Sequence, residues 1–205
     1  EALRSLPKGV NLLMFLPVNP LMIYVMGVDA AKTRRPTREE MDEMKRLIHE
    51  AMDAGACGIG LSHLGTGNSH TDFDGTPMPT DTMHVDDAAE LASVLGERDE
   101  GFIQCLPQLG FTRDLDFAER LAEASGRPIV VNVIAPTTLA PDMHLPQLEW
   151  LEDMRAKGHQ IFGQGFLHRA WSEFNLLEPN INDHAPAWKK LCCGTTLEQR
   201  LEMIK

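Results

Sequence analysis

Short, continuous apolar runs alternate along the chain with stretches in which apolar residues recur three or four positions apart. The runs predict strands that are buried on both faces, and the spaced stretches predict amphipathic helices. Strands are expected at 10–18, 56–62, 101–107, 128–134 and 159–166, and helices at 37–54, 85–95, 114–125 and 147–157. Because parallel neighbours need a crossover connection, strands that alternate with helices indicate a parallel sheet.

The clearest helix begins at Thr37. Thr37 and Glu40 have the spacing of a capping box, in which both side chains accept hydrogen bonds from free backbone N–H groups. Gly55 is expected to end the helix. The predicted core face of this helix consists of Met41, Met44, Leu47, Ile48, Ala51 and Met52.

Two parallel architectures compete, the doubly wound sheet and the (β/α)8 barrel. A dinucleotide-binding sheet favours a glycine-rich turn from a strand directly into a helix, whereas GTGN at 65–68 runs on into a long loop. Long loops after the strands fit a barrel, whose functional groups lie at the carboxyl ends of the strands. We therefore expect a (β/α)8 TIM-type barrel, present as an incomplete portion with about five βα units.

The domain prediction is one catalytic-barrel segment over 1–205. Within it, 171–205 loses the alternating pattern and is expected to form an irregular insertion followed by a short helix, which Thr195 and Glu198 would cap. An incomplete barrel leaves sheet edges that invite strand pairing, so we expect either a longer polypeptide or a homo-oligomer.

Composition and charge narrow the class of partner. The formal net charge of −11 argues against nucleic acid, since the only basic cluster is 32–35. The most apolar stretch, 10–28, is interrupted by Pro17, Asn19 and Pro20, which argues against a membrane span and favours buried core. The four cysteines form neither a disulfide framework nor a CxxC pattern, so reduced thiols and a cytoplasmic location are expected.

A family resemblance rests on particular stretches of sequence. VMG at 25–27 and RRPTREEMDEMKRLIHEAMDAGACGIGLS at 34–62 resemble D-aminoacylase-like enzymes, the N-acyl-D-amino-acid deacylase branch of the amidohydrolase superfamily. SGRPIVVNVI at 125–134 and LEWLEDMRAKGHQIFGQ at 148–164 look like the next two βα units of that family. The resemblance implies a zinc-assisted barrel hydrolase that cleaves an amide bond of a small-molecule N-acyl amino acid or a related compound.

The sequence departs from the family pattern where metal ligands are expected. His-x-His occurs nowhere, and Cys105 and the pair Asn132 and Val133 stand where the family has metal-binding histidines. Cys105 is the candidate metal ligand, as a thiolate, with a small core residue as the alternative. Most zinc ligands would then lie outside this chain.

The remaining candidates follow the strand ends. His63 and His168 are the candidate catalytic residues, and simple polar boundary positions are the alternative. The candidate substrate-binding residues are Ser62, His70, Asp72, Asp74, Gln104, Asn132 and Gln164. A metal-free barrel enzyme and a non-catalytic relative that binds a small ligand or serves as an assembly subunit remain alternatives.

Overall fold

The structure is a computed structural model that describes residues 7, 9, 12–66, 72, 75–107, 115–136, 141–165, 173 and 196–204. Five strands form one sheet in the order β1-β2-β3-β4-β5, and every neighbouring pair is parallel. The strands are β1 (Phe15–Pro17), β2 (Gly58–His63), β3 (Phe102–Pro107), β4 (Ile129–Ile134) and β5 (Ile161–Gly165).

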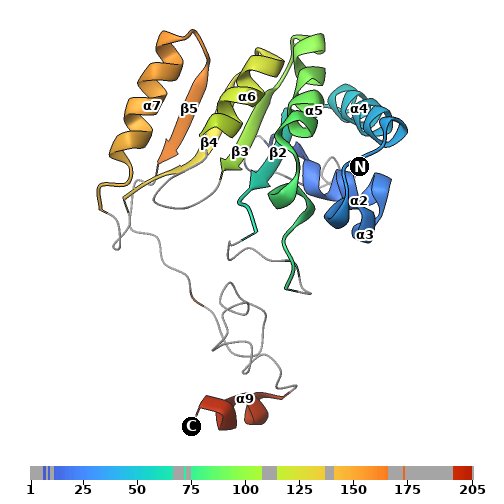
Figure 1. Ribbon diagram of the computed structural model, residues 1–205, viewed down its shortest axis with the longest axis vertical. Helices are drawn as coiled ribbons and strands as arrows, with labels where there is room; N and C mark the ends of the chain where they lie inside the picture. The colour runs from blue at the N-terminus through green and yellow to red at the C-terminus, as the bar shows by residue number, and fades with distance from the viewer. Residues whose placement is uncertain are drawn as a thin grey trace.

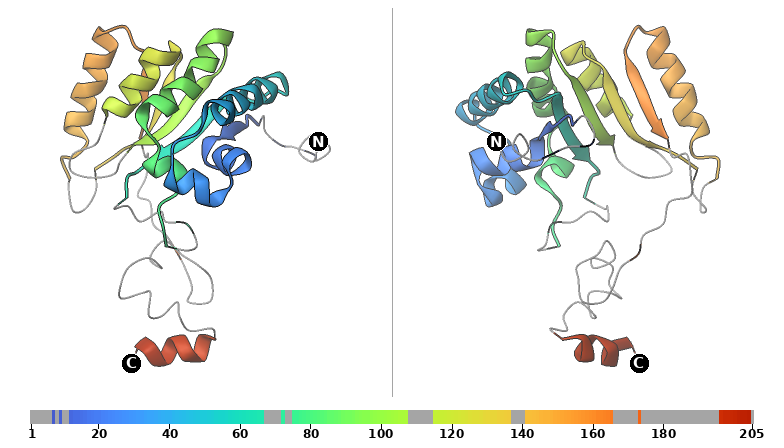
Figure 2. Two further views of the ribbon diagram at one scale, coloured as in Figure 1. Left: turned by 45° about the vertical axis from the view of Figure 1, so that its right-hand side comes forward. Right: turned by 180° about the vertical axis from the view of Figure 1, so that it is seen from behind.

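The helices that connect the strands lie on one face of the sheet (Figure 1). Seen from behind, the strands stand in front of these helices (Figure 2). The connecting helices are α4 (Arg38–Asp53), α5 (Val85–Arg98), α6 (Asp116–Ser125) and α7 (Leu145–Ala156). A parallel sheet whose strand order never reverses, with its helices on one side, is the wall of a (β/α) barrel rather than a doubly wound sheet. The expected architecture of about five βα units is confirmed as an open portion of a barrel.

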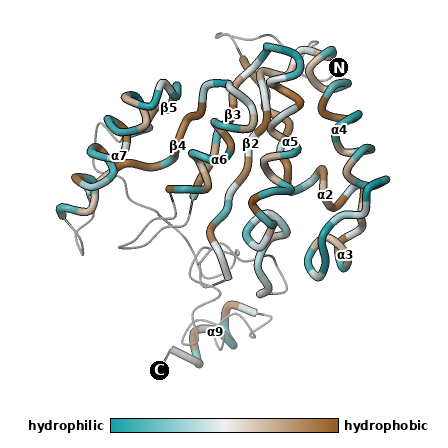
Figure 3. The backbone as a smooth tube through the Cα atoms, turned by 45° about the horizontal axis from the view of Figure 1, so that its top comes forward, coloured by the Kyte–Doolittle hydropathy of each residue, from teal (hydrophilic) through white to brown (hydrophobic). Residues whose placement is uncertain are grey.

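The hydrophobic core fills the layer between the sheet and the helices. Ile59, Ile103 and Val131 from the strands meet Met44 and Ile48 of α4 in one cluster of buried residues. Apolar residues run along the strands while hydrophilic residues occupy outer turns of the helices (Figure 3). One face of the central strands β2, β3 and β4 therefore packs against the helices, which leaves their other face for function.

The N-terminal part differs from the prediction. The expected strand at 10–18 is only β1, and Val18 already begins α2 (Val18–Met26), which is followed by α3 (Val28–Thr33). Pro20 lies in the first turn of α2, where the missing N–H of proline costs nothing. The stretch is also not wholly buried, since the Tyr24 side chain is 78% exposed.

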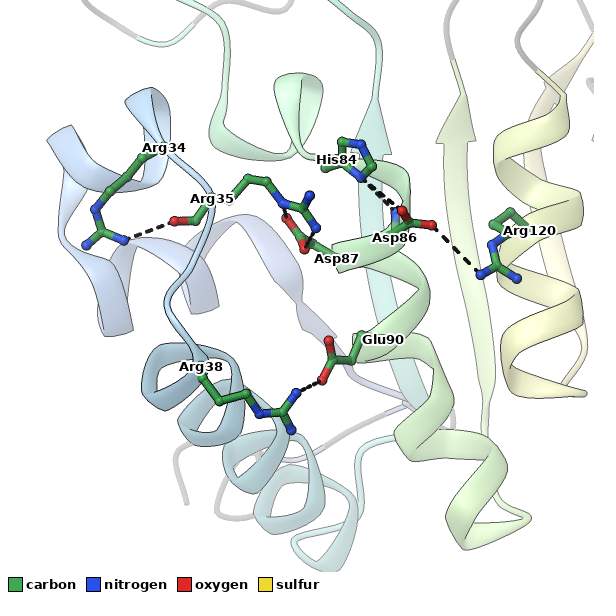
Figure 4. Close-up of polar contacts among 8 residues, drawn as sticks. All are labelled: Arg34, Arg35, Arg38, His84, Asp86, Asp87, Glu90 and Arg120. Carbon is green, nitrogen blue, oxygen red and sulfur yellow. Dashed lines mark hydrogen bonds and ion pairs between the residues drawn. The ribbon is translucent and has the colours of Figure 1, made fainter.

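Ion pairs join successive βα units on the outer surface. Arg35 donates two hydrogen bonds to the carboxylate of Asp87, at 2.6 and 2.9 Å, and Arg38 donates one to Glu90 at 2.7 Å. Figure 4 shows these contacts crossing to α5 from the loop before α4, which carries Arg35, and from the first residue of α4, Arg38. Asp87 also lies beside Asp86, which contacts Arg120 of α6 at 3.8 Å. Ion pairs as well as apolar packing therefore hold the neighbouring helices together.

The C-terminal helix α9 (Leu197–Ile204) is capped one residue later than predicted. Thr196 accepts a hydrogen bond from the N–H of Gln199, and the Gln199 side chain accepts one from the N–H of Thr196, each at 3.2 Å. Thr195 and most of 171–195 lie outside the described residues. Within the part that is described, no helix is long and apolar enough to cross a bilayer.

Candidate functional site

The candidate site is the face of the sheet opposite the connecting helices α4, α5, α6 and α7, called the open face below. Side chains alternate between the two faces of a strand, and the buried residues mark the helix-covered face. In β3, Ile103 and Cys105 are buried, so Gln104 between them lies on the open face. By the same alternation Ser62 of β2 and Asn132 of β4 lie on the open face.

The strand register brings several of these side chains together. Asn132 pairs with Gln164 of β5, so their side chains are neighbours on the open face. Gln104 pairs with Gly60, whose lack of a side chain leaves space beside it. Ser62, Asn132 and Gln164 all lie near the carboxyl ends of their strands. The open face therefore carries the predicted substrate-binding residues Ser62, Gln104, Asn132 and Gln164 on four neighbouring strands, with Gln104 one step below the other three, level with Val130.

All four of these side chains are neutral hydrogen-bonding groups. The open-face positions of the described strands carry hydroxyl, carboxamide, glycine, proline and apolar side chains, and none of those described positions is ionisable. Carboxamides and hydroxyls orient polar groups of a ligand well but are poor ligands for zinc, which prefers imidazole, thiolate and carboxylate. This part of the wall is suited to holding a substrate and does not form a zinc site.

A short 3-10 helix, η1 (Pro79–Thr82), closes over the end of β2. The Thr80 and Ser62 hydroxyls lie 3.4 Å apart, and the Asp81 carboxylate accepts a hydrogen bond from the N–H of Leu64 at 2.9 Å. Thr80 and Asp81 are fully buried. This role of Asp81 could not be predicted from the sequence, because its partner Leu64 lies 17 residues earlier.

His63 lies on the opposite side of the sheet from Ser62. Its ring stacks on Phe117 of α6, with centroids 4.1 Å apart and planes 10° apart. Its Nε2 atom is 3.0 Å from the carbonyl oxygen of Met83; a carbonyl only accepts, so Nε2 carries the proton. The ring borders an open hollow of about 570 Å³ that is also lined by Val85 and Arg120. The structure therefore places the predicted catalytic imidazole among the helix N-termini rather than on the open face.

Cys105, the candidate metal ligand, is completely buried in the apolar cluster between sheet and helices. The alternation along β3 that turns Gln104 to the open face turns Cys105 away from it. Among the described residues, the group of three potential ligand side chains that lie close together does not include Cys105. The placement fits the alternative interpretation, a small core residue.

That group of three potential ligands lies on the helix layer. Atoms of Glu119, Glu123 and His159 come within 4.8 Å of one another. Both carboxylates already have cationic partners, because Lys157 lies 2.5 Å from Glu119 and Arg120 lies 3.5 Å from Glu123. The ion pairs account for this cluster without a metal ion.

The predicted loop residues divide between described and undescribed positions. Asp72 is held by Lys32 of α3, with 2.6 Å between the ammonium nitrogen and the carboxylate. Lys32 also donates a hydrogen bond to Thr76 at 2.8 Å, so the loop is anchored to the N-terminal helices. His70, Asp74 and the predicted catalytic His168 lie outside the described residues.

Two solved structures of deacylases are similar in fold to this chain. An N-acyl-D-glutamate deacylase from Bordetella bronchiseptica, solved with zinc and a phosphonate mimic of the tetrahedral intermediate, superposes with a TM-score of 0.61 at 17% identity. A D-aminoacylase structure, concerned with the binuclear metal centre of that enzyme, gives 0.63 at 19% identity. The chain shares its fold with these deacylases. The D-aminoacylase resemblance expected from 34–62 is thereby confirmed at the level of fold.

The matches cover most of this chain but a minor part of the other proteins. The superpositions include 78% and 82% of the chain, which spans 31% and 32% of the two deacylases. In sequence, 61 residues are 39% identical to uncharacterised proteins of Mycobacterium bovis and Mycobacterium tuberculosis, covering 29% of this chain and 10% of those proteins. No protein-family model matches. The shared fold therefore stands without a shared family assignment.

Proposed function

We propose that this chain forms the substrate-binding wall of an amidohydrolase-type barrel enzyme that cleaves a C–N bond, the amide of an N-acyl amino acid or a related compound. The row of neutral side chains at the carboxyl ends of the strands, Ser62, Asn132 and Gln164, carries the proposal. An amide group offers one donor and one acceptor, which hydroxyl and carboxamide side chains complement without ionic charge. The shared fold with two deacylases supports the same reaction class.

Zinc enters the proposal through the similarity to deacylases whose structures concern metal centres. A bound zinc ion would polarise the scissile carbonyl and lower the pKa of an attacking water. The described open face lacks the ligand types that zinc prefers, so its ligands would have to come from residues outside that face. We assign to the described residues the binding and orientation of the substrate only.

His63 is assigned to positioning rather than to proton transfer. Its stacked ring and its hydrogen bond to Met83 link the end of β2 to α6 and to the residue that follows η1. Both contacts fix the loop that covers Ser62. His168 stays a candidate catalytic residue on the grounds of its sequence position after β5.

The deciding experiment is a hydrolysis assay on the full-length polypeptide with a panel of N-acyl-D-amino acids, with and without a chelator. We expect release of the free amino acid and loss of turnover on metal removal, restored by added zinc. An Asn132→Ala and Gln164→Ala double variant should raise KM by at least about tenfold, since two substrate hydrogen bonds are lost. Turnover that is untouched by the double variant would exclude this wall as the substrate site.

A second candidate function is small-molecule binding without catalysis. The absence of ionisable side chains on the open face of the described strands favours it, since catalysis of amide cleavage needs an acid, a base or a metal ion. Equilibrium binding of an N-acyl amino acid, without product after prolonged incubation in the presence of zinc, would support this function over hydrolysis.

We also propose that the sheet edges at β1 and β5 pair with further strands, either of the same polypeptide or of a second copy. In the described residues each of these two strands has one neighbour only. Unpaired backbone groups at a sheet edge favour strand addition. Light scattering on the full-length protein separates a monomer that closes its own barrel from an oligomer.

A further inference from the structure

Asn132 and Gln164 are direct neighbours at the carboxyl ends of β4 and β5. They are partners in the strand register, and parallel strands lie about 4.8 Å apart, so the two carboxamides point from the same edge of the open face. Below them on the same two strands lie Val130 and Phe162, which are also register partners. Phe162 is 55% exposed. The two carboxamides thus stand at the upper border of an apolar strip.

The Asn132 carboxamide has an unmet hydrogen-bonding requirement. Its Oδ1 atom is enclosed, and among the described residues no donor lies within hydrogen-bonding distance of it. An enclosed acceptor without a donor costs free energy that almost all buried polar groups in native proteins avoid. The terminal torsion of an asparagine side chain is broad, so a modest rotation turns the oxygen toward a donor that arrives from the open side.

Gln164 differs from Asn132 in exposure. Its side chain lies in a strand whose residues are exposed from Phe162 onward, so its N–H groups are available to a ligand. A carboxamide that presents an acceptor beside a carboxamide that presents a donor matches the two polar groups of a secondary amide, one N–H and one C=O. The apolar strip below is suited to an aliphatic or aromatic acyl group.

We propose that Asn132 Oδ1 accepts a hydrogen bond from the amide N–H of the substrate, that Gln164 donates one to its acyl oxygen, and that the acyl chain lies on Val130 and Phe162. This assignment rests on the proposed function and adds the feature by which the site selects its substrate. An ester of the same shape replaces the N–H by an oxygen whose lone pairs face Asn132 Oδ1. The pair of carboxamides therefore selects amides over esters.

The test measures inhibitor or substrate binding to the full-length protein by isothermal titration calorimetry, with N-acetyl-D-leucine and with the ester analogue in which oxygen replaces the amide nitrogen. The native protein should bind the amide at least about tenfold more tightly, the ratio that one lost hydrogen bond plus an unpaired acceptor produces. In Asn132→Ala that ratio should fall to near one. Asn132→Asp keeps an acceptor and should retain a preference for the amide.

Val130→Ala is the matched control, because Val130 lies on the same strand and the same face but offers no hydrogen bond. It should weaken both ligands by the same factor and leave the amide-to-ester ratio unchanged. A ratio near one in the native protein, or an unchanged ratio in Asn132→Ala, overturns the assignment. Amide-selective binding without any hydrolysis would instead overturn the proposed function while the assignment stands.

Discussion

The imidazole of His63 lies flat against the ring of Phe117, with 4.1 Å between centroids and 10° between planes. Phe117 is itself fully buried, so the contact fixes the end of β2 against α6. A ring held by stacking on one side and by the Met83 carbonyl at its edge is well placed to hold neighbouring segments. His63, although it directly follows the open-face residue Ser62, therefore stabilises the packing of β2 against α6.

Two substitutions of His63 distinguish a positioning role of this residue from a catalytic one. His63→Phe keeps the stacked ring and should retain hydrolytic activity within about threefold, whereas His63→Ala should lose stability by about 1–2 kcal/mol through the missing contacts. Activity assays and thermal unfolding of both variants give the answer. Equal and complete loss of turnover in the two variants, with normal Tm for His63→Phe, would instead identify the imidazole as catalytic.

Removing the carboxylate of Asp87 should destabilise the contact between the start of α4 and α5. Asp87 is buried and receives two hydrogen bonds from Arg35. Asp87→Ala should lower the free energy of unfolding by about 2 kcal/mol, or roughly 4–8 °C in Tm. Asp86→Ala is the matched control, since the Asp86 side chain is exposed and its ion pairs are 3.5 and 3.8 Å long. A control that loses as much stability as Asp87→Ala would contradict the assignment.

The capping box of α4 predicts a pH dependence. The Arg34 guanidinium, at 2.6 and 2.7 Å, and the N–H of Thr37 lower the pKa of Glu40 to about 2. A carboxyl with a lowered pKa in the folded state stabilises the protein fully above its ordinary pKa of 4.5, and this contribution is lost as pH falls from there toward 2. Glu40→Gln keeps the cap but not the charge.

Thermal unfolding of both proteins between pH 7 and pH 2 provides the measurement. The native protein should have the higher Tm at neutral pH, and the difference should narrow below pH 4.5 as Glu40 takes up a proton. The effect should be modest, because the pair lies near the surface and salt screens it. A constant difference over the whole range would mean that Glu40 does not titrate as described.

The alternation of strands and helices was predictable because the spacing of apolar residues shows which side of an element is buried. That spacing is two residues in a strand with one buried face and three to four residues in a helix. The helix α2 was not, because an apolar run with prolines has no distinct period and Pro20 is tolerated in a first turn. The cap of α9 was displaced by one residue because Thr195 and Thr196 have the same side chain, and only geometry shows which one faces the helix.

The candidate site was predictable in part for the same reason. Ser62, Gln104, Asn132 and Gln164 share the open face, and their role in substrate binding stays a prediction. Which of two adjacent residues lies on the open face depends on the register of the strand. The register places Ser62 and Gln104 on the open face, and it places their neighbours His63 and Cys105 on the helix-covered face. Long-range partners such as Phe117 leave no local signal in the sequence.

Replacement by alanine should have opposite effects on stability at two glycines of β2. At Gly58, φ is +146° and a Cβ atom would lie 1.8 Å from the carbonyl oxygen of Phe102, part of the backbone of the neighbouring strand. Gly58→Ala should therefore cost about 4 kcal/mol or more, or prevent folding, because the sheet would have to separate. At Gly60 the nearest atoms are Oε1 of Gln104 at 3.4 Å and Cβ of Phe15 at 3.5 Å, both ordinary contacts.

Gly60→Ala should therefore fold with a stability within about 1 kcal/mol of the native protein while placing a methyl group on the open face beside Gln104. If the open face binds the substrate, this methyl should raise KM by about three- to tenfold with little change in kcat, the signature of lost ground-state binding. Circular dichroism and steady-state kinetics on the two variants distinguish the outcomes. A Gly60→Ala variant that is well folded and kinetically unchanged would place the substrate away from β2 and Gln104, because a methyl group that borders a bound substrate changes its affinity.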